Sequence, residues 1–338
     1  MKNVLVSGYF GFGNLGDEII KEVINRELKK NNIIALFLVK EKKNENEINR
    51  TNIVEILKSL KEVNAFISGG GGLLQDKTSL KSLLYYTTLI NLSKIANKKT
   101  FIFAQGIGPL KKNISKKIVK HALTGVDLIT VRDEESKNLL LECGLKNEIF
   151  VTSDLAFLYE FSTLPTLPIE ENYNVLQIKG NENIDIEEIA DIARFIHYKT
   201  HYETILVPFY PAVDLGLAKK INEKTKFPVF VPKTFEEAFS VLKNAKFVVG
   251  TRYHSIVFSI MLKKPVLPIF YDDKVKNLSK FIGLTGIEIK DLTLSNFANV
   301  FTDFVKQQKE ITSLIENKLP QLKENAKRNF EAFLKYLH

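Results

Sequence analysis

Residues 3–18 read NVLVSGYFGFGNLGDE, and the order of elements within this stretch decides the fold class. An apolar run at 3–7 leads into a glycine-rich loop at 8–16, and a helical pattern follows over 17–30. A strand that is apolar on both faces and enters a helix through glycines is typical of a parallel sheet with helices on each face. The start of the chain therefore predicts an α/β fold.

The same alternation continues along the chain in two series. The first predicts further strands at 33–39, 64–68, 100–104 and 127–131, and helices at 48–61, 79–96, 115–123 and 134–143. The second predicts strands at 173–178, 204–208, 229–231, 247–250 and 266–269, and helices at 187–201, 215–224, 234–244 and 253–262. A polar stretch with two prolines at 162–168 separates the series and is the expected linker.

Two such series in a chain of 338 residues predict two Rossmann-like domains. We expect an N-terminal domain at 1–165 and a C-terminal domain at 166–310. A helical pattern runs from residue 295 to the end, and Pro320 is expected to break it into two helices. Residues 311–338 are expected to pack as C-terminal helices at the domain junction, and a small-molecule site is expected between the two domains.

The charge balance points to an anionic partner. The chain has 48 basic and 39 acidic residues, and the basic residues are six Arg and 42 Lys. The lysines are dispersed and no nucleic-acid-binding motif is visible, so we expect no nucleic acid partner. Because Arg is the side chain whose planar fork fits carboxylate and phosphate, each of the few arginines inside a motif is a candidate ligand for an anion.

Other features of the composition concern the compartment. The single cysteine, Cys143, cannot form an internal disulfide and suits a reducing environment. The apolar run at the start is short for a signal peptide, and no run of about 18 apolar residues occurs. We expect a cytoplasmic protein whose contact with a membrane is peripheral, at its inner face.

The loop at 8–16 offers backbone N–H groups to an anion at a helix start. Its Gly11, Gly13 and Gly16 match the dinucleotide pattern G-x-G-x-x-G, but the first glycine lies three residues beyond the end of the strand. A Rossmann dehydrogenase is therefore the least favoured of the functions considered. Asp17 and Glu18 at the helix start are candidates for chemistry, and their alternative role is to cap the helix and complement its dipole.

Three further loops are expected at the same sheet edge. SGGGGLLQD at 68–76 holds four consecutive glycines, which predicts a ligand close to the backbone, and Asp76 is either a base for a hydroxyl or a helix cap. Gln105 ends the next strand, before another glycine-rich turn, and Arg132 ends the strand after that. For Arg132 the alternative is a structural ion pair with Asp133 or Glu134.

The second domain supplies the stretch VVGTRYHS at 248–255, a strand, a tight turn and a helix start. It places Arg252 and His254 side by side at a helix N-terminus, where an anion is favoured. Lys274 follows the next strand and is expected at the same edge.

These motifs together carry a family resemblance: GYFGFGNLGDE (8–18), SGGGGLLQD (68–76), AQGIGPL (104–110), VRDEES (131–136), TRYHSIVFSI (251–260) and YDDKV (271–275). In this order they resemble the polysaccharide pyruvyl transferases, most of all the CsaB type. The resemblance implies a GT-B-like fold, with two Rossmann-like domains facing across a cleft. It also implies transfer of the enolpyruvyl skeleton of phosphoenolpyruvate onto two sugar hydroxyls as a cyclic ketal, with release of phosphate.

For CsaB-like members the acceptor is a β-linked N-acetylmannosamine on a lipid-linked cell-wall precursor. Two segments depart from the family pattern, the turn at 252–255 and the segment SDLA at 153–156, and both concern the identity of the acceptor.

The resemblance and the chemistry together assign roles. We expect His254 to protonate the methylene carbon of the donor, and Asp17 or Asp76 to activate the acceptor hydroxyls. The expected donor ligands are Arg132, Arg252, Lys274, Gly70 and Gly71, and the expected acceptor ligands are Asn14, Gly13 and Gln105. No cofactor and no metal are expected, because Arg and Lys neutralise the phosphate.

Residues 111–120 hold five lysines, which form either a solvated helix face or a contact with anionic lipid or the acceptor's diphosphate. Two other functions remain open: a GT-B nucleotide-sugar glycosyltransferase and a non-catalytic polysaccharide- or nucleotide-binding module.

Overall fold

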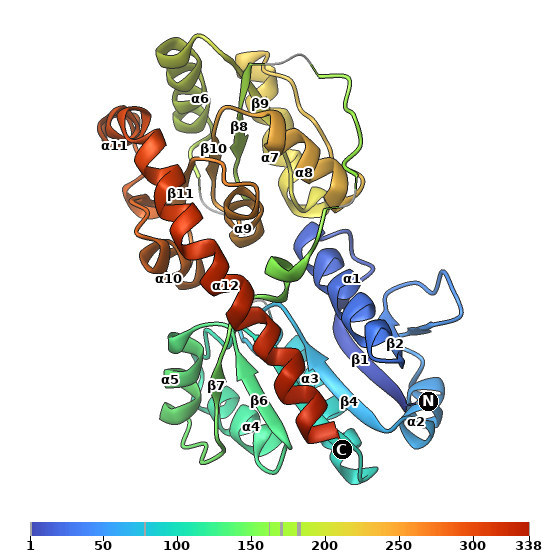
Figure 1. The fold of residues 1–338 in the computed structure, drawn as a ribbon. Coiled ribbons are helices and arrows are strands. Elements are labelled where there is room, and N and C mark those ends of the chain that lie inside the picture. The colour runs from blue at the N-terminus through green and yellow to red at the C-terminus, as the bar shows by residue number, and fades with distance from the viewer. Residues whose placement is uncertain (1, 78, 162, 170–171, 181–183, 338) are drawn as a thin grey trace. The chain divides into compact units, whose positions relative to one another are not determined.

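The computed structural model of the chain describes residues 2–77, 79–161, 163–169, 172–180 and 184–337. The chain forms two compact units, drawn in Figure 1: unit 1 comprises Met1–Tyr159 and Gln321–His338, and unit 2 comprises Glu160–Pro320. The change of unit thus falls a few residues before the boundary expected at 165. Of the expected linker at 162–168, Ser162 lies outside the described residues.

Unit 1 is built on a seven-stranded sheet in the order β3-β2-β1-β4-β5-β6-β7. Every neighbouring pair is parallel. The strands are β1 (Lys2–Phe10), β2 (Ile33–Val39), β3 (Glu47–Asn49), β4 (Ala65–Gly69), β5 (Lys99–Gln105), β6 (Leu128–Val131) and β7 (Phe150–Val151). Parallel strands bring their carboxyl ends to one edge, so the loops that leave this edge can share a site.

Helices cover both faces of this sheet (Figure 1). On one face lie α2 (Ile53–Glu62), α3 (Leu80–Ile95), α4 (Asn113–Leu123) and α5 (Glu134–Glu142), whose buried side chains share one core with alternate residues of the strands. On the other lie α1 (Leu15–Lys30), the short helix η1 (Leu155–Leu158) and the last part of α12 (Gln308–Leu337). Phe101 and Phe103 of β5 pack edge-on against Phe330 and Phe333 of α12.

Unit 2 has a five-stranded parallel sheet in the order β12-β11-β10-β8-β9. Its strands are β8 (Tyr173–Gln177), β9 (Glu203–Leu206), β10 (Val248–Gly250), β11 (Val266–Phe270) and β12 (Ile287–Glu288). Its helices are α6 (Ile186–Thr200), α7 (Pro211–Thr225), α8 (Phe235–Asn244), α9 (Tyr253–Met261), α10 (Asp273–Ile282), η2 (Ile289–Asp291), α11 (Leu294–Lys306) and the start of α12. The α/β class with parallel sheets is therefore confirmed in both units.

Three sequence-based elements are corrected. Pro320 does not break the C-terminal helix: α12 runs through it, and the chain breaks earlier, at Gln307 between α11 and α12. A proline removes one backbone hydrogen bond, and the apolar side chains of Leu319 and Leu322, both buried, hold the helix on each side of it. The helix expected at 48–61 is the short strand β3 followed by α2, and 229–231 contributes only a single bridge from Val229 to Leu206.

Within the described part of the chain, no helix combines the length and the apolar composition needed to cross a bilayer.

Candidate functional site

The first loop of unit 1 brings Asn14 and Asp17 together at the start of α1. Asn14 is the N-cap residue of α1, and its Nδ2 donates to Asp17 Oδ2 over 2.5 Å. Glu18 reaches back so that its Oε1 accepts from the backbone N–H of Gly11 at 2.8 Å. Glu18 therefore has the capping role that the sequence allowed, whereas the buried carboxylate of Asp17 faces the neighbouring loop. Gly13 has a φ of +74° and open space where a Cβ would be.

The glycines after β4 are explained by the approach of α1. A Cβ on Gly71 would lie 2.7 Å from Asp17 Oδ1, and one on Gly70 would lie 2.2 Å from Cγ2 of Ile20. Both glycines also have positive φ, +68° and +69°. Helix packing accounts for these two positions, so they do not by themselves indicate a ligand, and Gly71 brings its backbone against the Asp17 carboxylate.

Both carboxylate oxygens of Asp76 accept hydrogen bonds from the backbone that precedes α4. Its Oδ1 accepts from Lys111 N at 2.9 Å and its Oδ2 from Lys112 N at 3.0 Å. Burial pushes the pKa of Asp76 up, but the two backbone donors outweigh it and hold the pKa below its ordinary value. A carboxylate stabilised in this way is a weak base.

Gln105 at the end of β5 and Arg132 just after β6 are hydrogen-bonded to each other. The backbone N–H of Arg132 donates to Gln105 O at 3.1 Å, and Gln105 Nε2 donates to the carbonyl oxygen and the hydroxyl of Ser68. Arg132 Nη1 donates to Asp154 Oδ2 at 2.9 Å, with side chains 2% and 0% exposed. A Cβ on Gly106 would lie 2.7 Å from Arg132 Nε, so this glycine makes room for the guanidinium.

Arg132 thus forms the ion pair that was its alternative role, but with a different main partner. Asp133 Oδ2 lies 3.8 Å from its Nε, whereas Asp154 makes the close contact. Asp154 also accepts from Ala156 N at 3.0 Å and so caps η1. The segment SDLA at 153–156 therefore fixes Arg132 within unit 1.

Unit 1 also holds a cation that the sequence reasoning did not single out. The guanidinium carbon of Arg50 lies 5.1, 4.4 and 5.4 Å from the ring centres of Phe12, Tyr85 and Tyr86. Burial raises the pKa of Tyr86 to about 12 against the opposing effect of Arg50, and the charge of Asp17 adds to the rise. Arg50 follows β3, which the sequence pattern merged into a helix, so its place at this sheet edge was not foreseen.

In unit 2, Gln177 organises the turn between β10 and α9. Its Oε1 accepts from Arg252 N at 2.7 Å, from Thr251 N at 3.2 Å and from the Ser255 hydroxyl at 3.2 Å. Thr251 Oγ1 in turn accepts from Lys179 N at 2.8 Å. A buried amide at the end of β8 therefore fixes the first residues of α9. The sequence offered no sign of this beyond a polar residue at a strand end.

The Arg252 side chain forms a forked ion pair with Asp214 of α7. Nε donates to Oδ2 over 2.6 Å and Nη2 to Oδ1 over 2.5 Å, and the side chains are 15% and 0% exposed. Arg252 is the N-cap residue of α9, where the helix dipole favours a negative charge. The expected position of Arg252 at a helix start is confirmed, and Asp214 is a partner that sequence reasoning missed.

His254 and Lys274 lie at the starts of the two neighbouring helices. His254 is in the first turn of α9, partly exposed, with its ring edge-on to Tyr253 at 5.2 Å between centres. Lys274 is in the first turn of α10, and its Nζ lies 3.4 Å from Oδ2 of Asp272, the N-cap residue of α10. Lys179, after β8, holds its Nζ 3.4 Å from the ring centre of Tyr271, after β11. The carboxyl edge of this sheet therefore gathers three cations and an imidazole, together with the carboxylates of Asp214, Asp272 and Asp273.

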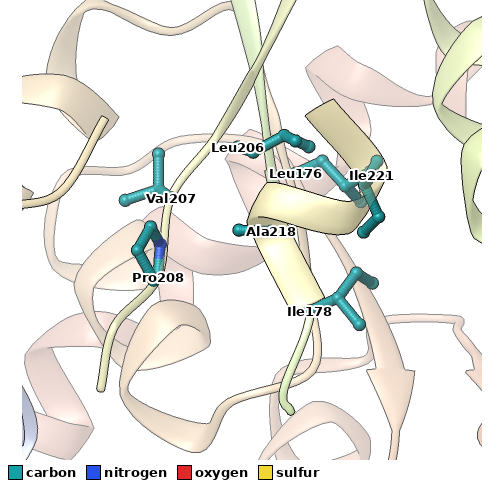
Figure 2. Close-up of a pocket in the computed structure, with 7 residues that line it drawn as sticks. All are labelled: Leu176, Ile178, Leu206, Val207, Pro208, Ala218 and Ile221. Carbon is teal, nitrogen blue, oxygen red and sulfur yellow. The ribbon is translucent and has the colours of Figure 1, made fainter. Parts of the chain in front are cut away.

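A pocket in unit 2 has none of these groups in its lining. Figure 2 shows it between β8, β9 and α7, lined by Leu176, Ile178, Leu206, Val207, Pro208, Ala218 and Ile221. An all-apolar lining offers no group to orient a polar ligand, so this pocket is a feature of core packing. Over the described residues, no group of three or more His, Cys, Asp or Glu side chains is arranged to hold a metal ion.

The sequence of these loops matches one family. The model of the polysaccharide pyruvyl transferases matches residues 14–273, which is more than three quarters of the chain. The chain belongs to the polysaccharide pyruvyl transferase family. The matched range starts at Asn14, the N-cap residue of α1, and ends at Asp273, so it includes Asp17 and the Arg252 turn of unit 2, whereas Gly13 and Lys274 lie just outside it. Membership in the polysaccharide pyruvyl transferase family makes the protein a transferase.

Several solved structures share the fold at low sequence identity. A structure of S. aureus MnaA with UDP has a TM-score of 0.71 at 12% identity, covering 99% of this chain and 98% of that one. UDP-GlcNAc 2-epimerase from Neisseria meningitidis with UDP-GlcNAc has a TM-score of 0.65 at 14% identity, covering 99% of this chain and 100% of that one. Anabaena HepE with UDP has a TM-score of 0.58 at 12% identity, covering 100% of this chain and 99% of that one. A comparison with curated proteins finds no match.

At this identity the likeness concerns the fold alone. This pyruvyl transferase family member therefore has a GT-B-like fold of two Rossmann-like units, as expected from its sequence, and the nucleotides in those structures say nothing about its own ligands.

Proposed function

We propose that the protein transfers the pyruvyl group of phosphoenolpyruvate to two hydroxyls of a cell-wall sugar, forming a cyclic ketal and releasing phosphate. Family membership supports the transferase activity. The observation that carries the choice of donor is Arg252, which stands at the start of α9 with a forked buried partner at the carboxyl edge of the unit 2 sheet. A small dianion with a carboxylate and a phosphate suits such groups.

The donor is proposed to bind in unit 2. Arg252 and Lys274 supply positive charge at the starts of α9 and α10, where the helix dipoles add to it. Lys179, held over Tyr271, adds a third cation at this edge. The pair with Asp214 uses Nε and Nη2 of Arg252, so Nη1 stays outside the pair and is the nitrogen proposed to meet the anion.

His254 is the proposed proton donor. Protonation of the methylene carbon of phosphoenolpyruvate leaves an oxocarbenium-like centre at C2, and the first acceptor hydroxyl adds there. The second hydroxyl then forms its bond to C2 as the C2–O bond to phosphate breaks, and its proton leaves with the phosphate. Imidazole is the side chain that most often serves as a general acid in enzymes.

The acceptor is proposed to bind in unit 1. Asp17 is the proposed base for the first hydroxyl, because Asp76 is stabilised as an anion by two backbone donors. Asn14, Gly13 and Gln105 remain the predicted acceptor contacts. The resemblance also implies that Arg132 and the glycines at 70 and 71 contact the donor. For Arg132 this prediction competes with its buried pair to Asp154.

The proposed acceptor is an N-acetylmannosamine residue of a lipid-linked precursor, as in the CsaB type. A lipid-linked acceptor places the enzyme at the cytoplasmic face of the membrane. The outer face of α4 suits such a contact: Lys111, Lys112, Lys117 and Lys120 are exposed, Ile114 is 52% exposed, and α4 has no acidic residue in its first turn. Basic side chains around an exposed apolar one favour an anionic lipid surface.

Sedimentation with vesicles tests the membrane contact. Vesicles containing phosphatidylglycerol should bind the wild-type protein and release it at high salt. Lysine-to-glutamine changes on α4 should weaken binding, whereas a matched set of exposed lysines in unit 2 should not: Lys219, Lys220, Lys226 and Lys243. Equal binding of both variant sets would refute a role for α4.

Phosphate release tests the reaction. Purified protein with phosphoenolpyruvate and a panel of lipid-linked acceptor analogues should release inorganic phosphate and add one pyruvyl group per acceptor, seen by mass spectrometry. A parallel panel of UDP-sugars tests the glycosyltransferase alternative. Glycosyl transfer from a UDP-sugar, without phosphate release from phosphoenolpyruvate, would refute the proposal.

A further inference from the structure

Asp214 is a fully buried carboxylate of unit 2 that lies against the Arg252 turn. Its two oxygens receive four donors: Nε and Nη2 of Arg252, the backbone N–H of Gly180 at 3.1 Å and the backbone N–H of Tyr210 at 3.0 Å. A carboxylate has about four lone-pair sites, so this set fills them. All of the hydrogen-bonding capacity of Asp214 is therefore used by groups of unit 2.

These four donors come from three different segments. Gly180 follows β8, Tyr210 is the N-cap residue of α7, and Arg252 is the N-cap residue of α9. The segments pack closely, since a Cβ on Gly180 would lie 2.0 Å from Val213 O. The Asp214 side chain thus accepts hydrogen bonds from three loops at the same sheet edge.

Helix capping explains only part of this arrangement. A carboxylate in a first turn commonly reaches back to a backbone N–H, as Glu237 of α8 does to Lys233 N at 2.8 Å. Capping of α7 in this way uses Tyr210 N and one oxygen. The fork to Arg252 and the bond from Gly180 use the remaining capacity, and they act on the turn that is proposed to bind the donor.

We infer that Asp214 is a positioning residue for the donor: it holds the Arg252 guanidinium by Nε and Nη2 so that Nη1 is presented to the anion. This inference rests on the proposed function. Gln177 fixes the backbone of Arg252 from β8, and Asp214 fixes its side chain from α7. Arg252 is therefore held from two sides before the donor binds, which lowers the entropy that binding must remove.

Asp214→Asn is the direct test. An amide keeps the shape but places an NH2 group among four donors, so the guanidinium loses its fork. We expect the KM for phosphoenolpyruvate to rise about 10- to 100-fold, as for loss of hydrogen bonds to a charged group, with a much smaller change in kcat. A purely structural role would lower the active fraction, which reduces kcat and leaves KM unchanged. Glu237→Gln is the matched control and should leave both constants unchanged.

A double-mutant cycle with Arg252→Lys completes the test. If Asp214 acts through Arg252, the KM of the double variant should equal that of Arg252→Lys alone, because the same contact has already been lost. If instead the KM of the double variant rises by the product of the two single-variant increases, the inference is overturned. Should Asp214→Asn fail to fold, Asp214→Glu keeps the charge at a displaced position; it should raise KM, and an unchanged KM there would likewise overturn the inference.

The wild-type protein separates this inference from the proposed function. If the wild type releases no phosphate from phosphoenolpyruvate with any acceptor, the proposed function fails, and the inference fails with it. If the wild type is active and the Asp214 variants keep its KM, only the inference fails.

Discussion

Two buried Arg–Asp pairs, one in each unit, show how the same chemistry serves different ends. In unit 1, Arg132 gives Nη1 to Asp154 and turns Nε toward Asp133, and its side chain is 2% exposed. In unit 2, Arg252 gives Nε and Nη2 to Asp214, and its side chain is 15% exposed. Arg132 is enclosed by the protein, whereas Arg252 is held at its base with part of the guanidinium outside the pair.

The difference teaches that a scarce arginine at a sheet edge is not in itself a ligand for an anion. Burial decides what each pair can do: an enclosed pair stabilises a unit only if it remains complete, and a less buried arginine with a nitrogen outside its pair can bind substrate. The comparison yields predictions on catalysis, stability and backbone geometry in the two units.

The largest effect is expected at His254, beside the accessible pair. His254→Gln should lower kcat for phosphate release by about 10²–10⁴-fold, since a positioned acid contributes that much, and should leave the melting temperature near that of the wild type. His121→Gln on the exposed surface of α4 is the control and should be silent. Near-normal kcat in a folded His254→Gln protein would remove His254 from the mechanism.

The enclosed pair should control stability. Arg132→Met leaves the Asp154 carboxylate buried without its main partner, so the free energy of unfolding should fall by about 3–5 kcal/mol. Chemical denaturation measures this loss, and Arg194→Met, which breaks an exposed pair with Asp191, should change stability little. A stable Arg132→Met protein with a raised KM for phosphoenolpyruvate would reverse the comparison and make Arg132 a donor ligand.

A smaller effect is expected where the unit 1 loop meets Asp17. Gly71→Ala adds a Cβ 2.7 Å from Asp17 Oδ1 at a φ of +69°, so it should cost about 1–3 kcal/mol and displace the proposed base, lowering kcat. Gly13→Ala has a similar φ of +74° but open space, so it should cost about 1 kcal/mol and no more. Equal losses in the two variants would mean that the contact with Asp17 is unimportant.

The smallest effect is a pH dependence at Asp76. Backbone donors lower the pKa of Asp76 in the folded state despite the opposing effect of burial. The contribution of Asp76 to the free energy of unfolding is therefore complete above the unfolded pKa of about 4, and it is lost as the pH falls through the lower folded pKa. Asp76→Asn should therefore be less stable than the wild type at neutral pH, and the difference should vanish in acid. A difference that grows as pH falls would contradict this assignment.

The fold was predictable because local patterns carry it. Runs such as Val4-Leu5-Val6 are apolar on both faces, and the periodicity of the intervening helices places most of the elements. The errors arise where tertiary packing outweighs local pattern. Pro320 stays inside α12 because neighbouring apolar side chains hold the helix, and β3 forms because Glu47–Asn49 pairs with β2.

The site was predictable only in part. Arg252 and His254 follow from a strand, a turn and a helix start within eight residues. Asp214 lies 38 residues from Arg252 and has nothing local to distinguish it from the other acidic residues. Likewise, no pattern links Gly71 to Asp17, because that contact depends on how α1 packs against the loop after β4.

Calorimetric titration with phosphoenolpyruvate tests the central claim, that the carboxyl edge of the unit 2 sheet binds the donor through Arg252. The account predicts saturable binding at one site per chain, with about tenfold or greater weakening in Arg252→Lys and no weakening in folded Arg132→Lys. A UDP-sugar titrated in parallel should give no heat of binding. Binding of the UDP-sugar with none of phosphoenolpyruvate, or equal affinity for phosphoenolpyruvate in the Arg252→Lys protein, would contradict the account.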